Sequence, residues 1–135
     1  MKYLFDTNIC IYLINNKYDY LINKVMETGI EEIAISTITI AELEYGIAKS
    51  RSKYKKENRI ALMEFLLPFK FLPFEQSDAY EYGVIRSRLQ VQGKIIGNMD
   101  MLIGAQAISS GLILVTNNVK EFNRIERLRI ENWIE

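Results

Sequence analysis

Histidine is absent from this chain, and cysteine is almost absent. The 135 residues contain no histidine and one cysteine, Cys10. Without histidine the chain cannot build a His-dependent catalytic triad, an imidazole acid–base pair or a His-ligated metal site. One cysteine excludes an intramolecular disulfide and a Cys-rich zinc site, and we expect Cys10 to be a buried apolar residue. Any bound metal ion must be held by oxygen, which favours Mg²⁺ or Mn²⁺ over zinc or copper.

Long apolar runs are missing too, and charge is balanced. No apolar stretch approaches the roughly 20 residues that cross a bilayer, so we expect no membrane association. An apolar, strand-like run begins within two residues of Met1, without the charged and hydrophobic regions of a signal peptide, which predicts a cytoplasmic protein. The 17 basic and 17 acidic residues cancel. This balance argues against a protein whose main role is non-specific binding to nucleic acid.

One segment departs from this balance. Between positions 49 and 59 the only acid is Glu57, and the basic residues are Lys49, Arg51, Lys53, Lys55, Lys56 and Arg59. Most such runs are solvated surface, but this one is the candidate for contact with phosphate groups.

Short apolar strands alternate with helical segments along what we expect to be a single domain, residues 1–135. The predicted strands are 2–6, 32–35, 69–74, 112–116 and 128–133. Four of the predicted helices are 8–15, 18–28, 58–67 and 100–109. Two more are predicted from their capping residues: one is capped by Ser36 or Thr37 and runs to 50, and the other is capped by Ser77 or Asp78 and runs to near Gly93. Residue 122 begins a short connection. This alternation predicts an α/β fold, a three-layer α/β/α sandwich around a mostly parallel sheet.

Three acids stand where apolar structure begins or ends. Asp6 ends the first strand, whereas Glu42 and Asp100 lie in the first turns of helices. Ligands of parallel α/β sheets gather at the carboxyl ends of the strands, so we expect the three acids to converge on one edge. Carboxylates beside buried hydrocarbon are costly unless their charge is compensated, and a divalent cation is one such compensation.

Each acid also has a simpler explanation. Asp6 and Asp100 both stand where a helix-capping residue is expected. Periodicity does not distinguish Glu42 from Glu44, since each shares a helix face with apolar residues. The spacing alone therefore leaves the choice between these two glutamates open.

Five segments of the chain resemble the PIN-domain family, most closely the VapC toxins of bacterial and archaeal toxin–antitoxin pairs. These segments are 4–9 (LFDTNI), 35–46 (ISTITIAELEYG), 97–105 (GNMDMLIGA), 114–118 (LVTNN) and 128–133 (LRIENW). They occur in the family's order and cover essentially the whole chain.

This resemblance implies an α/β/α fold and an Mg²⁺-dependent endoribonuclease that cleaves RNA, in this family often tRNA. It also implies a homodimer and a cognate antitoxin, with operator DNA bound only through that antitoxin. By position, Asp6, Glu42 and Asp100 match the family's catalytic acids, and Asp6 and Asp100 match its principal metal ligands. The resemblance thus selects Glu42 over Glu44. In the implied mechanism a metal-activated water, oriented by Glu42, attacks the phosphate.

The chain departs from the family pattern after the fourth strand. Many PIN domains carry a fourth acid there, but this chain has Asn117 and Asn118. Asn118 or the nearby Glu121 are the candidates to replace that acid, and the lost charge predicts one tightly bound ion. The preceding Thr116 is an auxiliary candidate that either contacts the phosphate or positions Asp6.

Two other readings compete with a nuclease. The first is a catalytically weakened module that works through antitoxin and operator binding, which the asparagine pair favours. The second is a phospho-acceptor signalling domain, which also collects acids at strand ends. That class usually has an acidic pair after its first strand, whereas here Asp6 is followed by Thr7.

Overall fold

The computed structural model describes residues 1–134, and within this range five strands form one sheet. Every neighbouring pair of strands is parallel, in the order β3-β2-β1-β4-β5. The strands are β1 (Tyr3–Phe5), β2 (Ile33–Ser36), β3 (Lys70–Leu72), β4 (Ile113–Val115) and β5 (Ile130–Glu131). β1 is central, so the first residue after it stands at the middle of the carboxyl edge. The predicted parallel α/β fold is confirmed.

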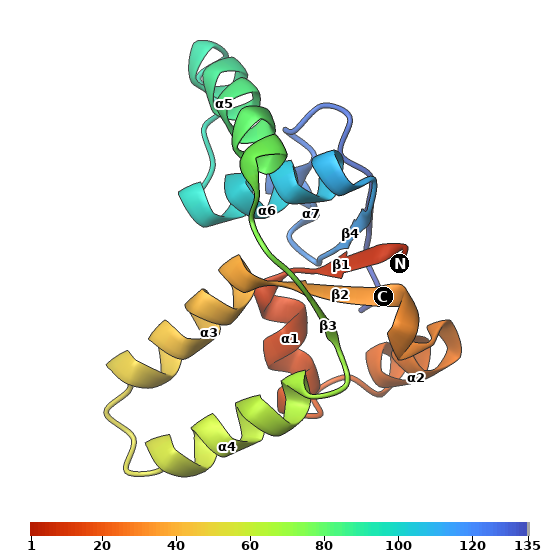
Figure 1. Cartoon of the computed structure of the whole chain (residues 1–135), viewed down its shortest axis with the longest axis vertical. Helices are drawn as coiled ribbons and strands as arrows, with labels where there is room; N and C mark the ends of the chain where they lie inside the picture. The colour runs from red at the N-terminus through yellow and green to blue at the C-terminus, as the bar shows by residue number, and fades with distance from the viewer. Residues whose placement is uncertain (135) are drawn as a thin grey trace.

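Helices cover both faces of this sheet (Figure 1). They are α1 (Thr7–Ile14), α2 (Asp19–Thr28), α3 (Thr37–Lys49), α4 (Lys55–Leu66), α5 (Gln76–Val91), α6 (Asn98–Ser110) and α7 (Val119–Phe122), with a 3₁₀ turn at Ile30–Glu32. The helices from α1 to α4 lie on one side and those from α5 to α7 on the other. This is the predicted three-layer arrangement.

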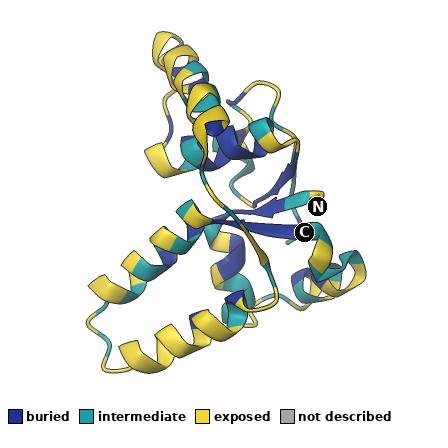
Figure 2. Ribbon diagram, viewed as in Figure 1, coloured by how far each residue is buried: buried dark blue, intermediate teal, exposed yellow. Residues whose placement is uncertain are grey.

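Alternate residues of each strand enter two separate cores. Leu4 and Leu114 pack with α5 and α6, whereas Phe5 and Val115 pack with α1, α2 and α4. Successive side chains of a strand point to opposite faces, and here both faces are covered. The central strands therefore consist of uninterrupted apolar residues, and Figure 2 shows them buried beneath helices whose outer surfaces are exposed.

Helix α6 is the most deeply buried helix near the sheet. A Cβ atom on Gly104 would lie 2.8 Å from Ile125 Cδ1, so glycine lets the C-terminal segment pack against the helix. The side chain of Gln106 is buried and donates from Nε2 to the carbonyl of Leu72 at 2.9 Å. The helix ends at Gly111 in the left-handed conformation, φ +67°, as the sequence predicts.

Several helix starts differ from the prediction. Helix α4 begins at Lys55 rather than Asn58, because its first turn is exposed and needs no apolar residues. Helix α5 is capped by Glu75 rather than Ser77 or Asp78. Asp78 instead completes a capping box, accepting from the Glu75 backbone N–H at 2.7 Å. The short helix α7 stands where the sequence predicts only a connection.

Helix α6 also begins earlier than predicted, at Asn98 rather than Asp100, with Gly97 as its N-cap. The outer strands are shorter than predicted, and β5 contains only Ile130 and Glu131. Within residues 1–134, no helix is both long and apolar enough to cross a membrane.

Candidate active site

Asp6 lies at the carboxyl end of the central strand and is 4% exposed. Its Oδ1 accepts a hydrogen bond of 2.9 Å from the Ile9 backbone N–H, so it caps helix α1. Its Oδ2 accepts a hydrogen bond of 2.5 Å from the hydroxyl of Thr116, the residue that follows β4. The capping explanation is therefore correct for one oxygen, while the other oxygen lies at the sheet edge between β1 and β4.

The two glutamates that periodicity could not separate have different surroundings. Glu42 is half-buried, and its Oε1 accepts a hydrogen bond of 2.6 Å from the hydroxyl of Thr7. Thr7 directly follows Asp6, so Glu42 lies beside the end of β1. Glu44 instead pairs with Arg59 through two contacts of 3.1 Å on the exposed side of α3. The structure thus places Glu42, and not Glu44, at the sheet edge.

Asp100 is the third residue of α6 and is not its cap, which corrects the expectation that it opens the helix. It is half-buried, and a Cβ on Gly97 would lie 3.6 Å from its Oδ2, so the carboxylate bends back over the helix start. Burial first, and then the charges of Glu42, Asp6 and Glu121, raise the pKa of Asp100 to about 6. Glu42, Asp6 and Glu121 are thus the acids whose charges act on the Asp100 carboxyl.

The pKa of Asp6 is also raised, mainly by burial. The hydrogen bonds from Thr116 and Ile9 oppose this rise, and the charge of Glu42 adds to it. Burial and the Asp6 charge together raise the pKa of the Cys10 thiol well above its ordinary value, so Cys10 is an inert buried residue as expected.

No basic side chain among residues 1–134 neutralises these four acids. The ion pairs of that range all involve other carboxylates, namely Met1 with Glu32, Arg59 with Glu44, Arg88 with Glu126 and Arg127 with Glu81. Half-buried negative charge without a partner is costly. The four acids therefore form an electrostatic site that favours a cation.

The donor set fits a hard divalent cation. All of its side-chain ligands are oxygens, as Mg²⁺ prefers. Within the described residues no group of three acids already stands close enough to hold one ion. This arrangement still suits Mg²⁺, which keeps several waters and commonly uses one or two carboxylates. Asp6 and Asp100, the predicted ligands, would be such a pair.

The residues after β4 differ in what they bring to this site. Thr116 Oγ1 donates to Asp6 and accepts from the Asn118 backbone N–H at 2.9 Å. Asn118 thus contacts the site through its main chain and forms the N-cap of α7. Glu121 lies near enough to raise the pKa of Asp100. The fourth negative charge of the region comes from Glu121.

Thr7 is a site residue that the sequence reasoning missed. Beside Asp6 and Asn8 it resembles one more capping residue, and its hydroxyl meets Glu42 only through a contact across 35 positions. No local pattern could have revealed this contact.

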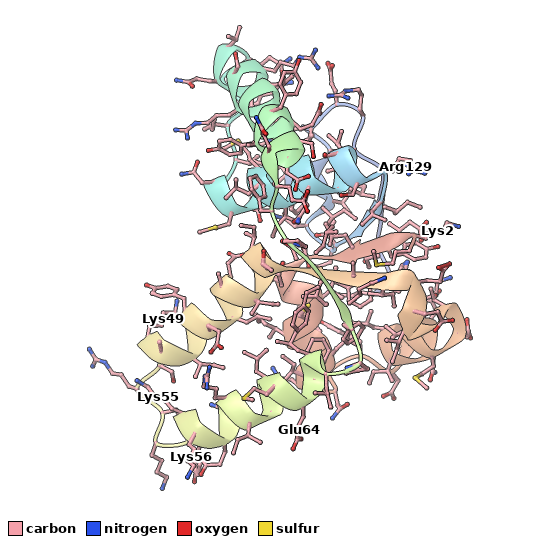
Figure 3. The ribbon with its side chains drawn as sticks, in the orientation of Figure 1. Lys2, Lys49, Lys55, Lys56, Glu64 and Arg129 are labelled. Atoms are coloured by element: carbon pink, nitrogen blue, oxygen red, sulfur yellow. The ribbon has the colours of Figure 1, made fainter. Side chains whose placement is uncertain are left out.

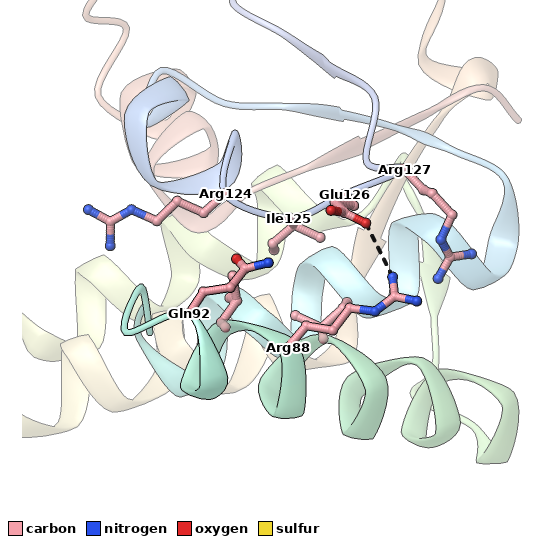
Figure 4. A pocket seen from close by; sticks show the side chains of 8 residues that line it. Arg88, Gln92, Arg124, Ile125, Glu126 and Arg127 are labelled. Carbon is pink, nitrogen blue, oxygen red and sulfur yellow. Dashed lines mark hydrogen bonds and ion pairs between the residues drawn. The ribbon is translucent and has the colours of Figure 1, made fainter.

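Two hollows differ in their relation to the acids. A groove of about 350 Å³ between α1, α3 and α4 begins at Glu42 and reaches Ser50 and Asn58, and its lining includes Ile11, Ile14, Leu43, Gly46, Ile47 and Leu62. The hollow in Figure 4, between α5 and residues 124–127, is about 10 Å³ and is bordered by the Arg88–Glu126 pair at 3.4 Å. None of the four acids lines it, and it is too small for a ligand.

The family model for the PIN domain matches residues 3–128. The chain belongs to the PIN-domain family. "Ribonuclease VapC2" of Rickettsia felis is 42% identical over 134 residues, covering 98% of each chain. The "tRNA(fMet)-specific endonuclease VapC" of Salmonella typhimurium is 37% identical, again covering 98% of each. Among solved structures, VapBC2 from Rickettsia felis bound to a promoter DNA fragment matches with a TM-score of 0.90 and 43% identity, covering 98% of this chain and 99% of that one.

These matches confirm the family that the five sequence segments resemble, and they span nearly the whole chain. The predicted class of enzyme agrees with the names of the VapC relatives.

Proposed function

We propose that this PIN-domain protein is a metal-dependent endoribonuclease and the toxin of a toxin–antitoxin pair. The observation that carries the proposal is the gathering of Asp6, Glu42, Asp100 and Glu121 in one region without a compensating base. A divalent cation compensates such charge, and RNA phosphodiesters are cleaved with the help of such cations. The names of the VapC relatives support RNA as the substrate.

Asp6 and Asp100 would hold Mg²⁺, for which Mn²⁺ can substitute. The bound ion would stabilise negative charge on a phosphate oxygen and lower the pKa of water. Thr116 and the Ile9 N–H keep the Asp6 carboxylate in one orientation. Thr7 holds Glu42, which would orient the attacking water and accept its proton. Glu121 supplies auxiliary charge, and we propose one tightly bound ion because Asn118 brings none.

The relatives and one groove of the structure support a proposal for the substrate and the partners. A relative named as tRNA(fMet)-specific supports tRNA as the substrate. DNA-bound VapBC complexes among the solved structures support a cognate antitoxin. We propose that operator DNA is bound only through that antitoxin. We propose that an apolar antitoxin segment occupies the groove beside Glu42. We propose a homodimer, as the resemblance to the VapC toxins implies. The proposed compartment is the cytoplasm.

Cleavage of bulk tRNA by the purified chain in Mg²⁺ tests the enzymatic proposal. We expect Asp6→Asn and Asp100→Asn to abolish cleavage while the protein stays folded, and Glu44→Gln to retain it. Full activity in Asp100→Asn would overturn the proposal. In cells, expression of the chain alone should arrest growth, and Asp6→Ala should relieve the arrest.

A second candidate is a non-catalytic module that works through its antitoxin. The uncharged Asn118 at the place of the usual fourth acid favours it. Calorimetric titration separates the two candidates, since the nuclease must bind Mg²⁺ or Mn²⁺ and the module need not.

A further inference from the structure

The connection between α3 and α4 carries positive charge that the proposed chemistry does not use. We name this cluster the basic tip, and it consists of Lys49, Arg51, Lys53, Lys55 and Lys56. All five side chains are exposed. In a chain of zero net charge, this is a strong local asymmetry.

The charges of the basic tip are not neutralised within the described residues. Arg59, the neighbouring cation, is paired with Glu44, but none of the ion pairs found in residues 1–134 involves the basic tip. Lys55 donates to the Ala48 carbonyl at 2.8 Å, which orders its side chain without removing its charge. Figure 3 shows Lys49, Lys55 and Lys56 gathered at the outer end of the α3–α4 hairpin, on the opposite side of the molecule from Lys2 and Arg129.

Two exposed tyrosines are interleaved with these cations. Tyr45 is 66% exposed and Tyr54 is 54% exposed. Lys49 Nζ lies 5.2 Å from the centre of the Tyr45 ring, and Lys53 Nζ lies 5.3 Å from that of Tyr54. A cation beside an exposed ring is the combination that binds single-stranded nucleic acid, with phosphate on the cation and base on the ring.

Helix α3 carries Glu42 and the first residue of the basic tip on the same face. Glu42, Tyr45 and Lys49 are spaced i, i+3 and i+7 on α3, so they share a face. The rise from Glu42 to Lys49 is about 10 Å. The groove between α1, α3 and α4 also extends from Glu42 to Ser50 and Asn58, at the base of the basic tip.

We infer that the basic tip is an RNA-binding subsite separate from the acids, where its cations contact phosphates and Tyr45 and Tyr54 stack on unpaired bases. This inference rests on the proposed function. Four acids at the cleavage site repel a polyanion, and a nearby positive surface raises the local concentration of substrate. An acidic protein segment would also form ion pairs with the lysines. It has no bases to stack on the two exposed tyrosine rings, however, whereas RNA does. The expected ligand is a single-stranded or looped RNA segment that runs along α3.

The test compares the double variant Lys53→Glu/Lys56→Glu with the matched control Lys2→Glu/Lys24→Glu. Both change the net charge equally, and the control residues lie outside the basic tip. Binding of bulk tRNA and of an unstructured RNA oligonucleotide is measured in the Asp6→Asn background, which prevents cleavage. We expect the tip variant to weaken binding about tenfold or more. Its slope of log affinity against log salt should fall by about 1.4, because each lost single-strand phosphate contact contributes about 0.7.

The tyrosines are tested separately. Tyr45→Ala should weaken binding several-fold, whereas Tyr45→Phe keeps the ring and should bind like the parent. An equal effect of the tip and control double variants, or a tip variant that weakens only the antitoxin complex, would overturn the inference.

The same variants distinguish this inference from the proposed function. If the otherwise unmodified chain cleaves RNA in Mg²⁺ and the tip variant binds and cleaves equally well, the subsite is wrong and the nuclease stands. If RNA binds through the basic tip but is never cleaved, the subsite stands and the nuclease is wrong.

Discussion

The hydroxyl of Thr7 donates a hydrogen bond of 2.6 Å to the carboxylate of Glu42. The two residues are 35 positions apart, and this bond joins the first turn of α1 to α3. Because Asp6 caps the same turn, the bond keeps Asp6 and Glu42 in a defined relation. It is the contact that distinguishes Glu42 from Glu44.

Replacement of Thr7 by valine should lower kcat about tenfold or more and leave KM nearly unchanged. Valine keeps the shape but removes the hydroxyl that orients Glu42, and hydrogen bonds to a charged group contribute about 1.5–3 kcal/mol. Steady-state cleavage kinetics measure this effect. Thr7→Ser keeps the hydroxyl and should restore kcat, so an equal loss in the serine variant would contradict a positioning role.

Thr116→Val should shift the acid limb of the pH–rate profile to higher pH. Burial raises the pKa of Asp6, and the hydrogen bond from Thr116 lowers it. Without this hydrogen bond the pKa of Asp6 should therefore rise further. Asp6 is then protonated at a higher pH, where it can no longer bind a cation. Cleavage rates measured across the acid range test this prediction, and Thr116→Ser is the matched control. An unshifted profile in the valine variant would contradict it.

Asp100→Asn should stabilise the protein at pH 7 while abolishing cleavage. The folded-state pKa of Asp100 is raised from 3.8 to about 6, so the carboxyl favours folding below pH 4 and this contribution is lost as the pH rises through 6. Such a rise in pKa corresponds to a loss of at most about 3 kcal/mol in the free energy of unfolding. Solvent screening of a half-buried group reduces this loss to about 1 kcal/mol. Denaturant unfolding at pH 7 and pH 4 measures the difference, which should vanish at the lower pH. A less stable variant at pH 7 would contradict the prediction.

Mg²⁺ should raise the melting temperature of the otherwise unmodified chain, with one ion bound per protomer. Binding to the folded state alone stabilises it by about 2.7 kcal/mol when the ion is at 100 times its Kd. The double variant Asp6→Asn/Asp100→Asn should show no such rise, whereas Glu44→Gln should respond like the parent. Thermal scans with Mg²⁺ and with a chelator test this, and titration calorimetry gives the stoichiometry. Equal stabilisation of the double variant would mean that the ion binds elsewhere.

Much of the fold was predictable from local pattern. Short apolar runs between amphipathic segments predicted a parallel sheet covered on both faces, because strands buried on two sides need continuous apolar residues. Gly111 marked a helix end, since it adopts φ +67° with no side chain to hinder it. The lack of histidine, together with a single buried cysteine, restricts the metal chemistry of this chain to oxygen ligands.

The details of the site depended on contacts between distant positions. Asp6 and Thr116 are 110 positions apart, and they meet because β1 and β4 are neighbours in the sheet. The exact start of α6 placed Asp100 in its first turn rather than at its cap. Hydrophobic periodicity records which face of an element is buried but carries no information on which elements pack together. Strand order and helix packing supplied that information, and they brought Asp6, Thr116 and Glu42 to one edge of the sheet.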